Sequence, residues 1–124
     1  MPDRKTVFVV DDDLSMLRGV KRLLRQHGFD SMLFGSAEAL RNHRDFSAGC
    51  CIVLDINLHD ESGIELRQQL KASGVALPVV YITGNDSQAT RAAAIASGCI
   101  AYLTKPFHAQ SLIEPIERAL ASMA

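Results

Sequence analysis

The sequence predicts an α/β domain built around a parallel five-stranded sheet with helices on both of its faces. Two observations carry this prediction. Apolar runs without polar alternation, such as residues 6–10 (TVFVV), are typical of strands that are buried on both faces of a parallel sheet. Segments with the helical spacing of apolar residues separate these runs along the chain, and strands that alternate with helices favour parallel pairing.

The composition is that of one globular domain. The chain has 124 residues, of which 48% are apolar and 22% are charged, so we expect residues 1–124 to form a single domain. The net charge of −1 argues against bulk electrostatic binding to nucleic acid or to an anionic membrane. No apolar run reaches the ~20 residues of a membrane span, and we expect no secretory signal at the N-terminus. Cys50, Cys51 and Cys99 lack zinc-ligand spacing and lie among apolar residues, which indicates reduced thiols in a cytoplasm.

Five strands are expected. Residues 6–10, 50–54 and 79–83 are the clearest, because each is a short apolar run rich in β-branched residues. Residues 31–34 and 100–103 give weaker versions of the same pattern.

The first two expected helices precede and follow the second strand along the sequence. An apolar stripe over residues 16–24 predicts a helix that ends at His27 and Gly28. Ser36 can cap a short helix that runs through Leu40.

The third and fourth helices are expected from capping residues and glycines. Ser62 and Glu65 have the spacing of a capping box, and this helix should stop at Gly74. Asp86 or Ser87 can cap an alanine-rich helix that stops near residue 98.

The last helix carries an apolar stripe over residues 112–120, and Pro115 should kink or loosen it. Five strands that alternate with five helices at this length predict the flavodoxin-like strand order 2-1-3-4-5.

Polar residues follow the strands at their carboxyl ends, where such folds bind ligands. These residues are Asp11, Asp12 and Asp13 at the end of the first strand, Asp55 at the end of the third, Thr83 at the end of the fourth, and Lys105 with Pro106 at the end of the fifth. The first and third strands are neighbours in the expected order, so the carboxylates of Asp11, Asp12 and Asp55 should converge.

Converging carboxylates need a proton or a cation between them. Two such charges ~4 Å apart repel by about 4 kcal/mol at an effective dielectric constant of 20. A few carboxylates with water are the usual ligands of Mg²⁺, and Mn²⁺ can take its place. A carboxylate nucleophile, a divalent ion, the Lys105 ammonium and the Thr83 hydroxyl are the groups that phosphoryl transfer requires.

This ordered set resembles the receiver domain of two-component response regulators. Segments such as LPVVYITGN and AYLTKPF are most similar to FixJ-type receivers, and the likeness runs from residue 7 to about residue 120. The resemblance implies that Asp55 accepts a phosphoryl group from a sensor histidine kinase, a phosphotransfer protein or a small phosphodonor. It also implies that the domain catalyses only its own phosphorylation and dephosphorylation, without turnover of an outside substrate.

The resemblance further implies a metal site. Asp12 and Asp55 correspond to direct Mg²⁺ ligands, the backbone carbonyl of Asn57 corresponds to a third ligand, and Asp11 contacts the ion through water.

Other matching positions concern the phosphoryl group and the response to it. Thr83 and Lys105 resemble the residues that hold the phosphoryl oxygens, and the bond between Lys105 and Pro106 resembles the family's cis peptide. Tyr102 resembles the aromatic residue that turns inward when Thr83 moves toward the phosphoryl group. Like FixJ-type receivers, the phosphorylated domain is expected to form a homodimer through the alanine-rich helix, the fifth strand and the last helix.

The loop over residues 57–63 departs from the family pattern. His59 stands where the family usually has proline, and Ser62 stands where it often has aspartate. Loss of the proline should leave the loop less restricted, and His59, Asp60 and Glu61 add unusual polarity beside the site.

Other interpretations remain open from the residues alone. Asp13 can be a solvated helix start, Tyr102 can fill the core, and His59 can be an exposed loop residue. A haloacid-dehalogenase-like phosphatase would use Asp11 as nucleophile and Asp13 as acid. A flavin-binding electron carrier is disfavoured because three aspartates would repel its phosphate, and a receiver fold kept as an interaction module would need none of the site residues.

Overall fold

The computed structural model describes residues 5–123, so both ends of the predicted domain, including the N-terminal residues 1–4, lie outside the described part. Its five strands are parallel in the order β2-β1-β3-β4-β5, which confirms the flavodoxin-like prediction. In chain order the elements are β1 (Thr6–Val10), α1 (Leu14–Gln26), β2 (Asp30–Phe34), α2 (Ala37–Arg41), β3 (Gly49–Asp55), α3 (Gly63–Ala72), β4 (Val79–Thr83), α4 (Gln88–Ala96), β5 (Ala101–Thr104) and α5 (Ala109–Ala121).

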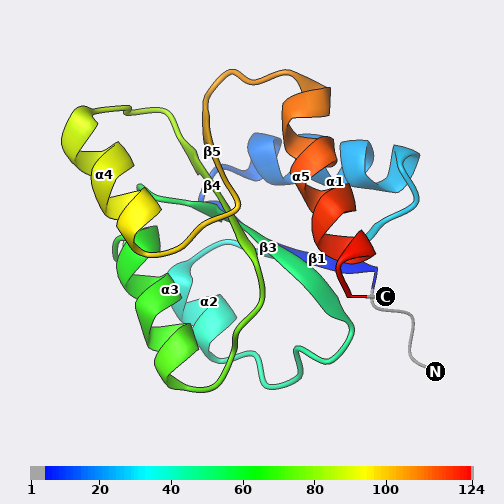
Figure 1. Ribbon diagram of the computed structural model, residues 1–124, viewed down its shortest axis with the longest axis horizontal. Helices are drawn as coiled ribbons and strands as arrows, with labels where there is room; N and C mark the ends of the chain where they lie inside the picture. The colour runs from blue at the N-terminus through cyan, green and yellow to red at the C-terminus, as the bar shows by residue number, and fades with distance from the viewer. Residues whose placement is uncertain (1–4, 124) are drawn as a thin grey trace.

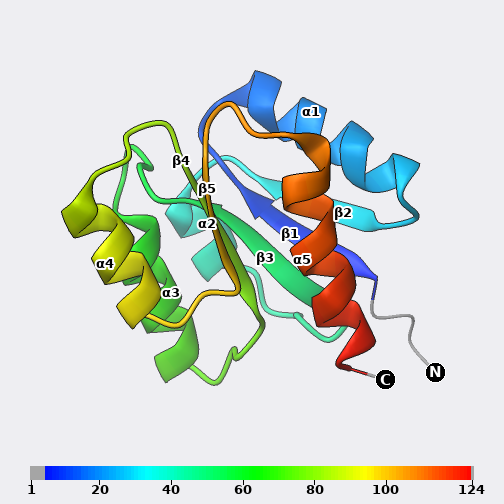
Figure 2. The same ribbon diagram turned by 45° about the horizontal axis from the view of Figure 1, so that its top comes forward.

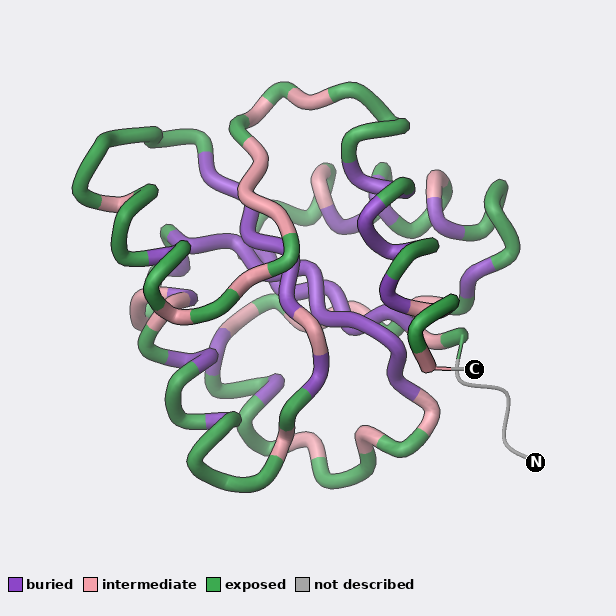
Figure 3. Tube along the Cα trace, viewed as in Figure 1, coloured by how far each residue is buried: buried purple, intermediate pink, exposed green. Residues whose placement is uncertain are grey.

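The helices cover the sheet in two layers. Helices α1 and α5 lie on one face, and α2, α3 and α4 lie on the other (Figures 1 and 2). Strands β3 and β4 are buried along their whole length, and β1 is buried from its second residue on (Figure 3). The edge strands β2 and β5 are only partly covered, which explains their weaker apolar pattern in the sequence.

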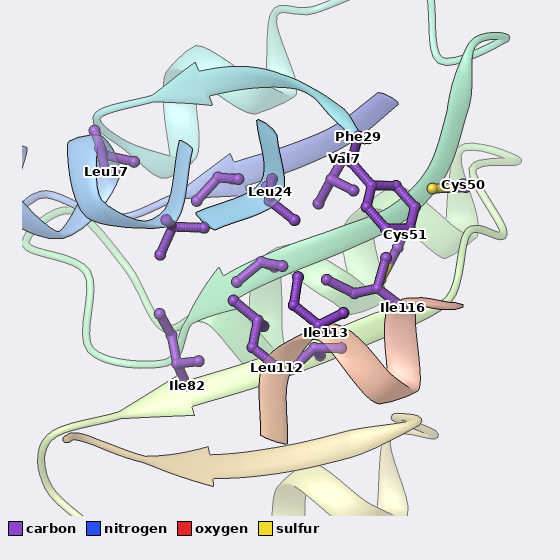
Figure 4. Close-up of a cluster of buried hydrophobic side chains, with 14 residues drawn as sticks. Val7, Leu17, Leu24, Phe29, Cys50, Cys51, Ile82, Leu112, Ile113 and Ile116 are labelled. Atoms are coloured by element: carbon purple, nitrogen blue, oxygen red, sulfur yellow. The ribbon is translucent and has the colours of Figure 1, made fainter. Parts of the chain in front are cut away.

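Each layer has its own hydrophobic core. Side chains of α1 and α5 meet those of β1, β3 and β4 on one face, with Leu24, Ile113 and Ile116 fully buried (Figure 4). On the other face Phe8 and Leu66 are at most 1% exposed. Because both faces of the central strands are packed, the sheet is a rigid base for the loops that follow its strands.

The N-caps of α2, α3 and α4 are residues that the sequence offered, and one capping contact differs from the prediction. Ser36, Ser62 and Ser87 are the N-caps of α2, α3 and α4, so of the two candidates for α4 the structure selects Ser87. The Ser62 hydroxyl accepts a hydrogen bond from the amide of Ile64, 3.2 Å away, one residue earlier than the capping box predicts.

Two further helical features bear on the predictions. Asp13 is the N-cap of α1, because its carboxylate accepts a hydrogen bond from the amide of Ser15 at 2.9 Å. Helix α5 continues as one element through Pro115, which is buried. No helix in the described part of the chain is long and apolar enough to cross a membrane.

Gly63 lets α3 begin directly against the end of β3. A Cβ atom at this position would lie 2.3 Å from the backbone oxygen of Asp55, which is too close for any side chain. The amide of Gly63 also donates a hydrogen bond to the carbonyl of Ile56 at 2.9 Å. Because Gly63 has no side chain, its backbone can pack directly against that of Asp55, the last residue of β3.

Candidate functional site

The polar residues identified in the sequence lie at the carboxyl edge of the sheet. Asp11 follows β1, Asp55 is the last residue of β3, Thr83 is the last residue of β4, and Lys105 follows β5. The strand order makes β1, β3, β4 and β5 consecutive neighbours, so their ends lie side by side (Figure 2). The predicted convergence of residues that are up to 94 positions apart is therefore present.

Three carboxylates form the centre of the site. One oxygen each from Asp11, Asp12 and Asp55 lies within 4.8 Å of the other two. Asp11 is fully buried and Asp55 is 4% exposed, whereas Asp12 is half-buried. Oxygen donors at these separations could hold a metal ion.

Lys105 supplies the positive charge at this cluster. Its Nζ atom lies 3.0 Å from Asp11 Oδ2 and 2.9 Å from Asp55 Oδ2, so one ammonium joins two carboxylates. Its bond to Pro106 is cis. Three ionised carboxylates against one ammonium leave an excess of two negative charges, which a divalent cation would balance.

Burial and these ion pairs change the acidity of both partners. Burial raises the pKa of Asp11 above its ordinary value, although the Asp13 amide and the Lys105 ammonium act in the opposite direction. Burial alone would lower the pKa of Lys105, but its hydrogen bonds to Asp55 and Asp11 raise it above the usual lysine value. Lys105 is therefore held in its charged form.

The raised pKa of Asp11 predicts how the stability of the metal-free protein depends on pH. A carboxyl whose pKa is raised in the folded state stabilises the fold fully below its unfolded pKa of about 4, and this contribution is lost as pH rises through the folded pKa. In EDTA, Asp11→Asn should therefore gain in free energy of unfolding relative to the unaltered protein as pH rises above about 4. Urea titrations at several pH values would measure this, and parallel curves for the two proteins would contradict it.

Asp12 contacts the loop between β3 and α3. Its Oδ2 atom accepts a hydrogen bond from the backbone amide of His59 at 3.0 Å and lies 3.1 Å from Nε2 of the same histidine. The imidazole is otherwise exposed, as the alternative interpretation of His59 predicted, but it adjoins a residue of the carboxylate cluster.

Thr83 is hydrogen-bonded to the same loop. Its hydroxyl donates to the side-chain oxygen of Asn57 at 2.7 Å and accepts from the amide of Asn85 at 3.0 Å. The backbone amide of Asn57 in turn donates a hydrogen bond to Asp55 Oδ1 at 2.9 Å. Sequence reasoning missed the Asn85 contact, although an amide two residues after a threonine is a recognisable local pattern.

Tyr102 lies beside α4 in a half-buried position. Its hydroxyl donates a hydrogen bond to Asp86 Oδ1 at 2.8 Å, and the guanidinium of Arg91 lies 4.6 Å from the centre of its ring. Its partner on the adjacent strand β4 is Tyr81, whose hydroxyl forms a hydrogen bond with the hydroxyl of Ser97. Tyr102 is thus held by polar contacts from the α4 side, while it also packs against the hydrophobic core on that face of the sheet.

Comparison with known proteins decides the family. The family model described as the response regulator receiver domain matches residues 7–117. The chain belongs to this family. The receiver domain is 33% identical over 121 residues to the response regulator protein TodT of Pseudomonas putida, a match that covers 97% of this chain and 53% of TodT. It is 30% identical over 120 residues to the transcriptional regulatory protein FixJ of Bradyrhizobium diazoefficiens, with 97% of this chain and 58% of FixJ covered.

Solved structures give the same result. The receiver domain matches the response regulator StyR with a TM-score of 0.85 and 41% identity, over 94% of this chain and 59% of that one. It matches the structure titled FixJ-N with a TM-score of 0.83 and 30% identity, over 100% and 98% of the two chains. The chain spans about half the length of the curated relatives it matches. It is the receiver domain of a two-component response regulator, as the strand-end residues suggested.

Proposed function

We propose that this receiver domain accepts a phosphoryl group on Asp55 with the help of Mg²⁺. The observation that carries the proposal is the joint contact of Lys105 with Asp11 and Asp55 beside the third carboxylate of Asp12. These residues combine a nucleophile, a site for a hard divalent ion and a fixed ammonium within one small volume.

The metal site would use Asp12 and Asp55 as direct ligands, with the backbone carbonyl of Asn57 as a third ligand and Asp11 acting through water. The donor set fits Mg²⁺ because all of these groups are hard oxygen ligands and carry an excess of negative charge. When bound, the ion neutralises charge on the phosphoryl oxygens, and Mn²⁺ can supply the same chemistry.

In the transfer step, a carboxylate oxygen of Asp55 attacks the phosphorus atom of a phosphohistidine. The new oxygen–phosphorus bond forms as the phosphorus–nitrogen bond breaks, and the imidazole nitrogen keeps the electron pair. The Lys105 ammonium then exchanges its contact with Asp55 for a phosphoryl oxygen. Thr83 must likewise give up its hydrogen bond to Asn57 to reach the phosphoryl group, so two existing contacts change in the phosphorylated state.

That change would pass to the surface through Tyr102. We infer that movement of Thr83 opens space behind it, and that the ring of Tyr102 leaves Asp86 and turns inward to fill this space. The affected surface comprises α4, β5 and α5. Because phosphorylation supplies contacts that only one of the two states can make, it shifts the balance between them.

The partners follow from this chemistry. The donor is a sensor histidine kinase, a phosphotransfer protein or a small phosphodonor, and we propose that the phosphorylated domain forms a symmetric homodimer through the α4–β5–α5 surface. Sedimentation with and without beryllofluoride and Mg²⁺ measures that dimer. The domain itself makes no direct contact with nucleic acid or membrane in this proposal. Free thiols at Cys51 and Cys99 support a reducing cytoplasm.

The proposal is tested by incubating the receiver domain with acetyl phosphate, with Mg²⁺ in one sample and EDTA in the other. We expect one labile acyl phosphate per chain, only with Mg²⁺, and no continuing release of phosphate from unrelated monoesters. A chain that takes up no phosphoryl group and shows no binding of beryllofluoride at millimolar Mg²⁺ would instead be an interaction module.

A further inference from the structure

The loop that joins β3 to α3 is fastened to α2 by its own side chains. An isolated antiparallel bridge between Asn57 and Ser62 closes the base of this loop, so residues 58–61 form its tip. The sequence predicts a loosely restricted tip, because His59 replaces the proline that the family usually has there. The structure shows three contacts that tie this tip to the neighbouring elements.

The first contact is made by Asp60 at the start of α2. Its Oδ1 atom accepts a hydrogen bond from the amide of Ala37 at 3.2 Å, and its Oδ2 atom accepts one from the amide of Glu38 at 3.1 Å. The hydroxyl oxygen of Ser36 accepts a hydrogen bond from the backbone amide of Ala39 at 3.1 Å. The first three amides of α2 are therefore satisfied, two of them by a residue 22 and 23 positions away.

The acidity of Asp60 agrees with this arrangement. Desolvation alone would raise the pKa of Asp60, but the amides of Glu38 and Ala37 hold it below its ordinary value. The carboxylate is thus charged at neutral pH and suited to the amide end of a helix.

The other two contacts lie on either side of Asp60. Glu61 forms an ion pair with Arg41 in the last turn of α2, and the Nε atom of Arg41 also donates to Gln69 on α3 at 3.0 Å. The amide of His59 donates to Asp12, as described above. Asp60 and Glu61 therefore hold the loop to both ends of α2, and His59 holds it to the end of β1.

We propose that Asp60 is a positioning residue for the metal site, and that its bonds to α2 fix the loop in the place of the missing proline. The proposal rests on the proposed function, since it concerns the Mg²⁺ ligand set. Asn57 lies at the base of the fastened loop and offers the carbonyl that would complete this set. A loop that spends less time in the competent arrangement binds the ion more weakly by the same fraction.

The test measures Mg²⁺ affinity by calorimetry, together with the amide signals of residues 57–62, for a set of matched variants. Asp60→Ala removes both acceptors, and we expect Mg²⁺ to bind about five-fold more weakly, the effect of losing a typical helix cap. Asp60→Asn removes the charge but keeps one oxygen acceptor, so we expect an affinity within about two-fold of the unaltered protein. Asp30→Ala is the control. It also deletes an exposed aspartate carboxylate, but Asp30 is the first residue of β2 and so lies at the end of the strand away from α2.

The comparison separates anchoring from charge. Equal weakening in Asp60→Ala and Asp60→Asn would show that charge alone matters and would overturn the proposal, as would unchanged affinity in Asp60→Ala. Glu61→Gln provides a second route, because it weakens the ion pair with Arg41 and should also lower the affinity. If the unaltered chain itself binds no Mg²⁺, the proposed function fails. If it binds Mg²⁺ and only the Asp60 variants are indifferent, the positioning role alone fails.

Discussion

Replacing Asp55 by asparagine should reduce phosphoryl uptake from acetyl phosphate to background. The amide is a far weaker nucleophile than the carboxylate, and the change also removes one ligand from the metal site. The shape is nearly unchanged, and the side-chain oxygen can still accept the hydrogen bond that the Asn57 amide now donates to Asp55. The measurement is intact-protein mass spectrometry after incubation with Mg²⁺, with hydroxylamine release to identify the acyl phosphate.

Asp11→Asn is the matched control for this experiment. It removes a carboxylate of the same cluster that also contacts Lys105, but it leaves the proposed acceptor in place. We expect slower yet clear labelling of this variant. Full labelling of Asp55→Asn together with none in Asp11→Asn would move the nucleophile to Asp11, as in a haloacid-dehalogenase-like phosphatase.

Replacing Lys105 by alanine should lower the rate of phosphoryl uptake by about 100-fold, the usual effect of losing one fixed electrostatic group that stabilises a transition state. Affinity for Mg²⁺ should be kept or increased, because the ammonium now occupies Asp11 and Asp55 oxygens near which the cation would lie. A general loss of structure would lower both the rate and the Mg²⁺ affinity, so it cannot produce this combination. Rates of labelling and Mg²⁺ titrations measure them separately.

Lys21→Ala is the control for Lys105→Ala, since Lys21 is an exposed lysine on α1. It should leave both the labelling rate and the Mg²⁺ affinity unchanged. If Lys105→Ala took up phosphate at the rate of this control, the ammonium would only balance charge in the resting protein and would have no role in the transfer.

The local sequence determined the elements of this domain and the edge of the sheet at which its chemistry lies. Strand β3 is an apolar run with no polar alternation, because both of its faces are packed, and that property is written in consecutive residues. The positions of Asp55 and Thr83 at strand ends follow from the same runs. Once the strands are taken as parallel, these ends must meet, so the grouping of the site could be predicted without coordinates.

The partners of the side chains were decided only by tertiary structure. Lys105 joins Asp11 and Asp55 across 94 and 50 positions of sequence, Thr83 is held by Asn57, and Tyr102 by Asp86. The loop after β3 is the clearest case, because its sequence predicts freedom where proline is missing. In the structure, the carboxylate of Asp60 in this loop accepts hydrogen bonds from the first two amides of α2. Such a contact depends on how two separate segments pack on the same face of the sheet, and no pattern within either segment encodes that distance.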